Sequence, residues 1–135
     1  MLYKFIDKIV NNEAVPITDL RMTRFFLKIE EAIRFVNFSY QYKSIYPKII
    51  PNLRAAKITD MAIAIGDILN KEVEFKVIGL RCNEKLHETL VTQHENSGFD
   101  HVDSNSAPRL SREEIVSLIK DEVVQYAKKI TDSRM

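Results

Sequence analysis

Residues 78–90 of the chain read Ile78-Gly79-Leu80-Arg81-Cys82-Asn83-Glu84-Lys85-Leu86-His87-Glu88-Thr89-Leu90. This stretch joins a run rich in β-branched and aromatic residues, residues 73–78, to an amphipathic segment that carries Leu86 and Leu90. Open α/β folds hold their ligands where a strand connects to a helix, and functional residues gather on such connections. The charged side chains at this junction therefore predict a binding site on a mixed α/β fold.

Length and charge favour a single small domain. The chain has 135 residues, with 20 basic and 19 acidic side chains and a formal net charge of +1. A chain of this size can bury roughly two-thirds of the surface that it exposes when unfolded. Because the basic and acidic side chains nearly cancel, the chain creates no global electrostatic field that would attract nucleic acid or anionic lipid. We expect neither partner. We predict one α/β (α+β) domain over residues 1–130, followed by a frayed tail over residues 131–135.

The compartment is predicted from the single cysteine and the amino-terminal residues. Cys82 cannot form an intramolecular disulfide, which fits a reducing compartment. Residues 1–8 alternate apolar and charged positions, so they lack the apolar core of a secretory signal. No apolar run approaches the roughly 20 residues of a membrane span. The cytoplasm is the expected location.

The hydrophobic pattern predicts about five helices and three or four short strands. Helices are expected over 2–10, 29–40, 60–69 with Thr59 as N-cap, from 84 or 85 to about 92, and after a capping box formed by Ser111 and Glu114. Extended segments are expected over 15–18, 44–46 and 73–78. Residues 19–24 are expected to be a polar connection, residues 48–56 are ambiguous, and residues 96–108 are expected to form a long loop or a partly mobile segment. Gly66 in the third helix indicates a close approach of another backbone.

Three side chains are candidates for binding a phosphorylated ligand. Arg24 and Arg81 lie on connections between apolar elements, and two arginines can clamp a diphosphate because each offers several planar donors and keeps its charge. The alternative is that these arginines are solvated or form surface ion pairs. Glu84 could accept hydrogen bonds from ribose hydroxyls, or it could simply complement the dipole at a helix N-terminus. Spacing alone leaves these alternatives open.

Other residue types offer no metal, cofactor or catalytic site. His87, His94 and His101 are seven residues apart, too far along a helix to share one ion. The helical turn predicted after Glu84 carries Lys85, His87 and Glu88, and these side chains are expected to form its exposed face. The three glycines are scattered at 66, 79 and 98, so no glycine-rich phosphate loop exists. No Tyr-x-x-x-Lys pair is present, and Cys82 has no base placed to activate it.

Several short motifs occur together in an order that resembles a known family. They are Pro16-Ile17-Thr18-Asp19, Met22-Thr23-Arg24-Phe25, Tyr46-Pro47-Lys48, Lys57-Ile58-Thr59-Asp60-Met61-Ala62 and Ile78 to Glu88. Over roughly residues 1 to 95 the chain resembles the C-terminal part of the polysaccharide-biosynthesis branch of the extended short-chain dehydrogenase/reductases, in particular inverting UDP-N-acetylglucosamine 4,6-dehydratases and UDP-sugar 4-epimerases. Cys82 and Asn83 stand where that family usually has proline and glycine. Asparagine tolerates the left-handed region better than most residues, so the turn can be kept.

The resemblance implies roles for the three candidates. Arg24 and Arg81 would lie against the diphosphate of a nucleotide sugar, and Glu84 would lie near its ribose. The family's N-terminal half, which holds the NADP-binding fold and the catalytic tyrosine and lysine, has no counterpart in this sequence. We therefore expect no cofactor and no catalytic residue in this chain, which would not be a self-sufficient oxidoreductase.

Two hypotheses about function follow from the resemblance. The first is a UDP-sugar-binding substrate domain, truncated and inactive alone, that pairs with a separately encoded Rossmann domain or with copies of itself. A surface toward such a partner would expose apolar side chains such as Phe25, Phe26 and Tyr46. The second is an interaction or structural module that keeps the fold without binding sugar.

Overall fold

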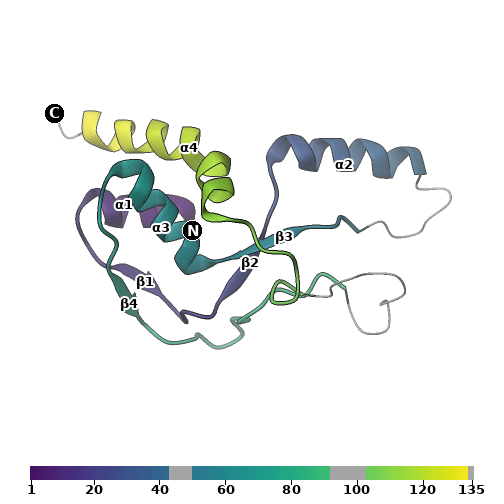
Figure 1. Ribbon diagram of the computed structural model, residues 1–135, viewed down its shortest axis with the longest axis horizontal. Coiled ribbons are helices and arrows are strands. Elements are labelled where there is room, and N and C mark those ends of the chain that lie inside the picture. Colours follow the sequence, from purple (N-terminus) through teal and green to yellow (C-terminus); the bar gives the residue numbers. More distant parts are fainter. Residues whose placement is uncertain (43–49, 92–102, 134–135) are drawn as a thin grey trace. The chain divides into compact units, whose positions relative to one another are not determined.

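A computed structural model describes residues 1–42, 50–91 and 103–133 (Figure 1). Within these ranges the chain forms four helices and four short strands, which confirms the predicted mixed α/β class. Their order is α1 (Leu2–Val10), β1 (Val15–Ile17), β2 (Thr23–Phe26), α2 (Ile29–Tyr42), β3 (Arg54–Lys57), α3 (Ile58–Leu69), β4 (Phe75–Val77) and α4 (Arg112–Asp132). The strand expected over 44–46 lies outside the described residues.

The chain divides into two compact units. Unit 1 comprises Met1–Met22, Lys57–Leu86 and Leu110–Met135, and unit 2 comprises Thr23–Ala56 and His87–Arg109. Each unit is therefore built from segments that are distant in the sequence. The single domain expected over residues 1–130 stays a prediction.

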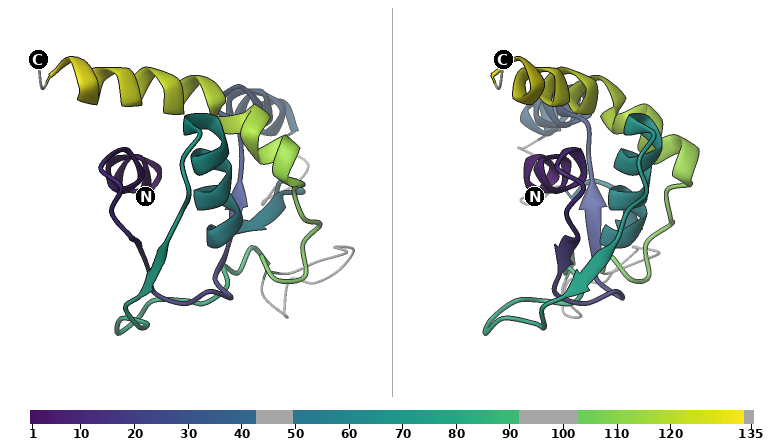
Figure 2. Two further views of the ribbon diagram at one scale, coloured as in Figure 1. Left: turned by 60° about the vertical axis from the view of Figure 1, so that its left-hand side comes forward. Right: turned by 90° about the vertical axis from the view of Figure 1, so that its left-hand side faces the viewer.

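Unit 1 is a three-helix layer with a two-stranded parallel sheet. α3 contacts both α1 and α4, while β1 pairs with β4 so that Val15 lies opposite Phe75 and Ile17 opposite Val77 (Figures 1 and 2). The core consists of apolar side chains at helical or alternating spacing, namely Phe5, Ile6, Ile9, Val15, Ile17, Met61, Ile65, Ile115, Ile119 and Val123, all at most 7% exposed. Burial of such side chains, at about 1.5–3 kcal/mol each, supplies most of the stability of the unit.

The helix α3 is as buried as its nearly continuous apolar sequence predicts, but it begins earlier than expected. Lys57 is the N-cap and Thr59 already lies within the helix, so the prediction of Thr59 as N-cap is wrong. The reason is that β3 leads directly into α3, and the buried Ile58 donates its amide hydrogen to the Met22 carbonyl oxygen at 3.0 Å. At the other end Asn70 takes the left-handed conformation, φ 52°, and ends the helix as predicted.

Gly66 confirms the predicted close approach. A Cβ atom at this position would lie 2.5 Å from Val73 Cγ2 and 2.7 Å from the Lys71 carbonyl oxygen. Only glycine leaves room for the chain to turn back across the helix at this point.

The closing helix α4 begins with the capping box predicted from Ser111 and Glu114. Its buried side chains, Ile115, Ile119 and Val123, follow one face at a spacing of four residues. The helix continues through Asp132. The frayed tail expected over residues 131–135 stays a prediction. Residues 134–135 lie outside the described part of the chain.

Unit 2 contains the strands β2 and β3, which pair with each other, and the helix α2. The polar connection predicted over residues 19–24 is wrong at its end, because Thr23 and Arg24 open β2 and Thr23 is only 1% exposed. The helix predicted from Ile29 is confirmed and extends to Tyr42. Its apolar face, however, is not buried: Ile29, Ile33 and Val36 are 67%, 55% and 64% exposed.

The helix predicted from 84 or 85 to about 92 is wrong. Residues 84–91 are irregular backbone with bends, and Thr89 makes an isolated antiparallel bridge with Asp103. Ser104 donates its amide hydrogen to the Glu88 carbonyl oxygen at 2.8 Å, so this carbonyl pairs across the unit and not with a helical neighbour. A long-range backbone pairing thus replaced the amphipathic helix indicated by Leu86 and Leu90.

Candidate functional site

The turn from Arg81 to Glu84 is closed by hydrogen bonds at both ends. Glu84 donates its amide hydrogen to the Arg81 carbonyl oxygen at 3.1 Å, and the Arg81 amide donates to Glu84 Oε2 at 3.4 Å. Gly79 and Asn83 have φ values of 82° and 69°, in the left-handed region. Asn83 therefore keeps a conformation that most residues disfavour, as predicted from its tolerance of that region.

Glu84 is held by two neighbours rather than by a helix. Its Oε1 atom accepts a hydrogen bond from the Thr18 hydroxyl at 3.3 Å, while Oε2 faces the Arg81 amide. No helix begins at this residue, so complementation of a helix dipole does not explain the glutamate. A carboxylate that is oriented in this way keeps lone pairs with which it can accept further hydroxyl donors.

Arg81 is exposed on the outer side of this turn. Among residues 1–42, 50–91 and 103–133, no carboxylate forms an ion pair with its guanidinium. An exposed guanidinium can offer planar, paired donors to phosphate oxygens. The structure thus brings Arg81 and Glu84 together on one turn of unit 1.

Arg24 lies in β2 of unit 2 and has a different environment. Its side chain is 18% exposed, and Nε lies 3.1 Å from Glu88 Oε1. One terminal nitrogen also donates to the Thr23 carbonyl oxygen at 2.7 Å. Arg24 thus forms an ion pair with Glu88, and its role toward a ligand stays a prediction.

A buried polar network in unit 2 was missed by sequence reasoning. The Thr23 hydroxyl lies 2.7 Å from His87 Nδ1 and 2.6 Å from the Ser104 hydroxyl, and Thr23 and Ser104 are 1% and 0% exposed. Spacing assigned His87 to the exposed face of a helical turn, but its ring is half-buried in a loop. The burial of Thr23 in the Met-Thr-Arg-Phe motif has no signature in one sequence, and Ser104 is 81 residues away.

Two arrangements of hydrogens satisfy this network. If Ser104 donates to the Thr23 carbonyl oxygen at 3.1 Å, the Thr23 hydroxyl donates to Ser104 and His87 Nδ1 donates to Thr23. If Ser104 instead donates to the Thr23 hydroxyl, Thr23 donates to a neutral His87. A charged imidazole donates from both ring nitrogens, so only the first arrangement is compatible with it.

Asp103 organises the turn that carries Ser104. Its Oδ1 atom accepts hydrogen bonds from the amides of Asn105 at 2.9 Å and Ser106 at 2.8 Å, and from the Ser106 hydroxyl at 3.0 Å. These bonds favour the charged carboxylate, and the Ser106 amide contributes most to holding the pKa of Asp103 below its ordinary value.

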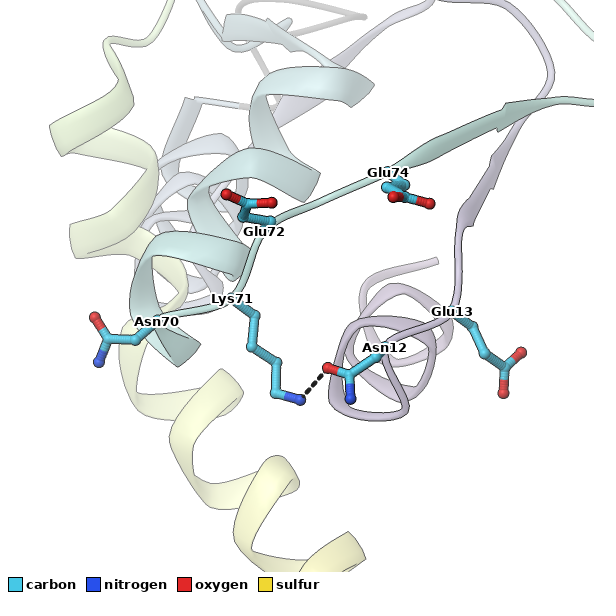
Figure 3. A pocket seen from close by; sticks show the side chains of 6 residues that line it. All are labelled: Asn12, Glu13, Asn70, Lys71, Glu72 and Glu74. Atoms are coloured by element: carbon cyan, nitrogen blue, oxygen red, sulfur yellow. Dashed lines mark hydrogen bonds between the residues drawn. The ribbon is translucent and has the colours of Figure 1, made fainter.

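A pocket of about 380 Å³ in unit 1 contains none of the predicted site residues. It is lined by Asn12, Glu13, Asn70, Lys71, Glu72 and Glu74. Lys71 crosses it to donate to Asn12 Oδ1 at 2.5 Å and to the Val10 carbonyl oxygen at 2.9 Å (Figure 3). A cation at the carboxyl end of a helix complements its dipole, so Lys71 anchors the end of α1.

The described residues do not fit the dinucleotide cofactor of the family that the sequence resembles. A pyrophosphate needs a glycine-rich turn between a strand and a helix N-terminus. Gly66 lies inside α3, and Gly79 follows β4 without a helix after it.

Residues 1–42, 50–91 and 103–133 contain no group of three or more histidine, cysteine, aspartate or glutamate side chains that could hold a metal ion. Within the same ranges, no helix combines the length and apolar character needed to cross a membrane.

Comparison with known proteins places the chain in a family. Residues 1–107 match the family described as polysaccharide biosynthesis protein, and the chain belongs to this family. It is 35% identical over 94 residues to a UDP-N-acetylglucosamine 4,6-dehydratase (inverting) of Campylobacter jejuni serotype O:2, which covers 68% of this chain and 27% of that protein. It is 29% identical over 96 residues to a UDP-glucose 4-epimerase of Rickettsia rickettsii, with 71% and 28% covered. The chain thus spans little more than a quarter of these relatives.

A solved structure has a similar fold. The X-ray structure of Pen from Bacillus thuringiensis superposes with a TM-score of 0.69 at 20% sequence identity, covering 90% of this chain and 44% of that one. At this identity the likeness concerns the fold alone.

Proposed function

We propose that this chain is a UDP-sugar-binding domain of a polysaccharide biosynthesis protein, similar to the C-terminal substrate domain of the 4,6-dehydratases and 4-epimerases. One observation carries the proposal. Arg81, exposed and without a carboxylate partner among the described residues, shares a closed turn with an oriented Glu84, in a chain that belongs to this family.

In the proposed mode of binding, the two side chains of the turn have distinct roles. The Arg81 guanidinium donates to the diphosphate oxygens, and Glu84 accepts from a ribose hydroxyl while Thr18 keeps its carboxylate oriented. The names of two relatives specify UDP-N-acetylglucosamine and UDP-glucose as their substrates, which makes UDP-sugars the class of ligand to test.

Arg24 is proposed as a second contact to the diphosphate. Its guanidinium is already oriented by Glu88 and by the Thr23 carbonyl oxygen, which reduces the entropy lost when a donor group binds a ligand. A double-mutant cycle with Arg24 and Arg81 measures whether both act on the same ligand.

The proposal extends to the activity of the chain. We propose that this chain, which is expected to be cytoplasmic, does not catalyse the reaction alone. A separately encoded Rossmann domain would supply the missing half of the enzyme, and copies of this chain are the alternative partner.

Isothermal titration with UDP-N-acetylglucosamine and with UDP tests the binding. Arg81→Ala should weaken UDP binding at least tenfold, which corresponds to about 1.4 kcal/mol, because the diphosphate loses paired charged donors. Arg34→Ala is the matched control, since it removes the same charge from an exposed position of α2. Absence of heat and of chemical-shift changes at millimolar ligand would refute sugar binding, and an Arg81 variant with wild-type affinity would exclude Arg81 from the site.

One observation favours the second hypothesis, an interaction module. The apolar face of α2 that carries Ile29, Ile33 and Val36 is exposed, as a face that binds another protein would be. In that case Ile33→Glu should abolish capture of a partner from the native cell and leave any UDP affinity unchanged. A captured partner that contains a Rossmann domain would support the first hypothesis, and an unrelated partner would support the second.

A further inference from the structure

We propose that Ser104 is a positioning residue that holds Arg24 in its ligand-binding orientation through Thr23 and Glu88. The ligand contact rests on the proposed function, whereas the positioning itself is a property of unit 2 alone. Ser104 lies beyond residue 95, where the resemblance to the family ends, and none of the sequence motifs points to it.

The Ser104 hydroxyl is buried and makes its hydrogen bonds within unit 2. Ser104 is 0% exposed, and its Oγ atom has three polar neighbours. These are the Thr23 hydroxyl at 2.6 Å, the Thr23 carbonyl oxygen at 3.1 Å and the Glu88 amide nitrogen at 2.8 Å. A buried hydroxyl with this many partners is costly to remove, because each neighbour would lose a hydrogen bond away from water.

On one side, Ser104 holds the carbonyl group that Arg24 contacts. The Thr23 carbonyl oxygen accepts a hydrogen bond from an Arg24 terminal nitrogen at 2.7 Å, and in the first arrangement of hydrogens it also accepts one from the Ser104 hydroxyl. The Thr23 side chain is held as well, since its hydroxyl lies between Ser104 and His87 Nδ1. The first residue of β2 is thus fixed at its backbone and at its side chain.

On the other side, Ser104 holds the backbone of the residue that forms an ion pair with Arg24. Its hydroxyl accepts from the Glu88 amide, and its own amide donates to the Glu88 carbonyl oxygen at 2.8 Å. Glu88 Oε1 then lies 3.1 Å from Arg24 Nε. Arg109 donates to the Ser104 carbonyl oxygen, which ties Ser104 to the end of the unit.

These contacts make the orientation of the Arg24 guanidinium depend on Ser104, which is distant in the sequence. Two groups that orient the guanidinium, the Thr23 carbonyl and the Glu88 carboxylate, belong to residues bonded directly to Ser104. Loss of the Ser104 hydroxyl should therefore release both groups together, and the guanidinium should lose its orientation.

The test follows the Arg24 Nε–H group by NMR, with assignment by its disappearance in Arg24→Lys. In Ser104→Ala we expect this proton to exchange with solvent at least tenfold faster than in the wild type, while the backbone spectrum of unit 1 is retained. Ser117→Ala, the same chemical change at an exposed position of α4, should leave the exchange unchanged. Ser104→Cys keeps nearly the same volume but forms weaker hydrogen bonds, and it is the second variant if Ser104→Ala does not fold.

Unchanged exchange of the Arg24 proton in a folded Ser104 variant would overturn the proposal. Titration with UDP separates this result from the proposed function. If UDP binds, Ser104→Ala and Arg24→Ala should weaken it by similar factors, and the double variant should be no weaker than Arg24→Ala alone. If UDP does not bind at all, the proposed function fails while the exchange measurement still decides the positioning role.

Discussion

Asp103 shows how one carboxylate makes the stability of unit 2 depend on pH. The amides of Asn105 and Ser106 bond its charged form, so the pKa in the folded chain lies below the ordinary value of about 3.9. A depressed pKa contributes stability that is fully present above the ordinary value and is lost as pH falls through the folded value. The turn should therefore loosen below about pH 4.

Asp103→Asn isolates this contribution from that of other carboxylates. The amide keeps one acceptor oxygen but cannot change its charge, so the unfolding free energy of the variant should fall less steeply between about pH 4 and pH 2. Chemical denaturation followed by circular dichroism at a series of pH values measures how the unfolding free energy of the wild type and of the variant changes with pH. Parallel curves for the wild type and the variant would show that Asp103 does not contribute.

Gly66 is a second residue whose substitution should change the stability of the chain. Alanine in a helix interior is favoured over glycine by about 1 kcal/mol, but the added Cβ would lie 2.5 Å from Val73 Cγ2 and 2.7 Å from the Lys71 carbonyl oxygen. Overpacking of this kind costs about 1–3 kcal/mol, so we expect Gly66→Ala to lower the free energy of unfolding.

Val73→Ala in the Gly66→Ala background supplies the control, because it removes the methyl group that the new Cβ meets. The double variant should lose less stability than the sum of the single variants. Urea denaturation measures the free energy of unfolding of the two single variants and of the double variant. A gain in stability from Gly66→Ala alone would mean that the chain after α3 moves away at little cost.

At the level of elements, α2 is a helix with the predicted apolar spacing, and its apolar face is exposed in the part of the chain that the structure describes. Its apolar residues at i, i+4 and i+7 gave a correct prediction of a helix, yet none of its residues is buried. Ile33→Gln should therefore change the free energy of unfolding by less than about 0.5 kcal/mol, as surface substitutions usually do.

Ile115→Val, in α4, is the comparison for that measurement. Ile115 is 0% exposed, and loss of one buried methyl group typically costs about 0.5–1.5 kcal/mol. Thermal unfolding of both variants compares the loss of unfolding free energy from the two substitutions. A larger loss from Ile33→Gln than from Ile115→Val would show that the α2 face is covered in solution.

At the scale of the whole molecule, the two units have different cores. Among the described residues, the large buried side chains such as Ile6, Met61 and Ile65 belong to unit 1. The buried side chains described in unit 2 are small: Thr23, Ala55, Ala56, Val91, Ser104 and Ala107. Less apolar area is thus available to hold unit 2 closed.

Native-state hydrogen exchange should show this difference. We expect the amides of β2 and β3 to exchange through openings of lower free energy than the amides of α3, because local stability follows buried apolar contacts. Equal free energies of opening across β2, β3 and α3 would instead mean that both units open as one cooperative whole.

Local periodicity, caps and left-handed residues were sufficient to predict the mixed α/β class, the helices at 2–10, at the start of α2 and after Ser111, and the turn at Gly79 to Glu84. The same local motifs singled out Arg81 and Glu84, which the structure places on one turn. Local patterns could not show that residues 84–91 are not helical, or that Thr23, His87 and Ser104 meet in a buried network. Those outcomes depend on hydrogen bonds between residues 16 to 81 positions apart, and a pattern within a single segment carries no record of the partner that such a bond will find.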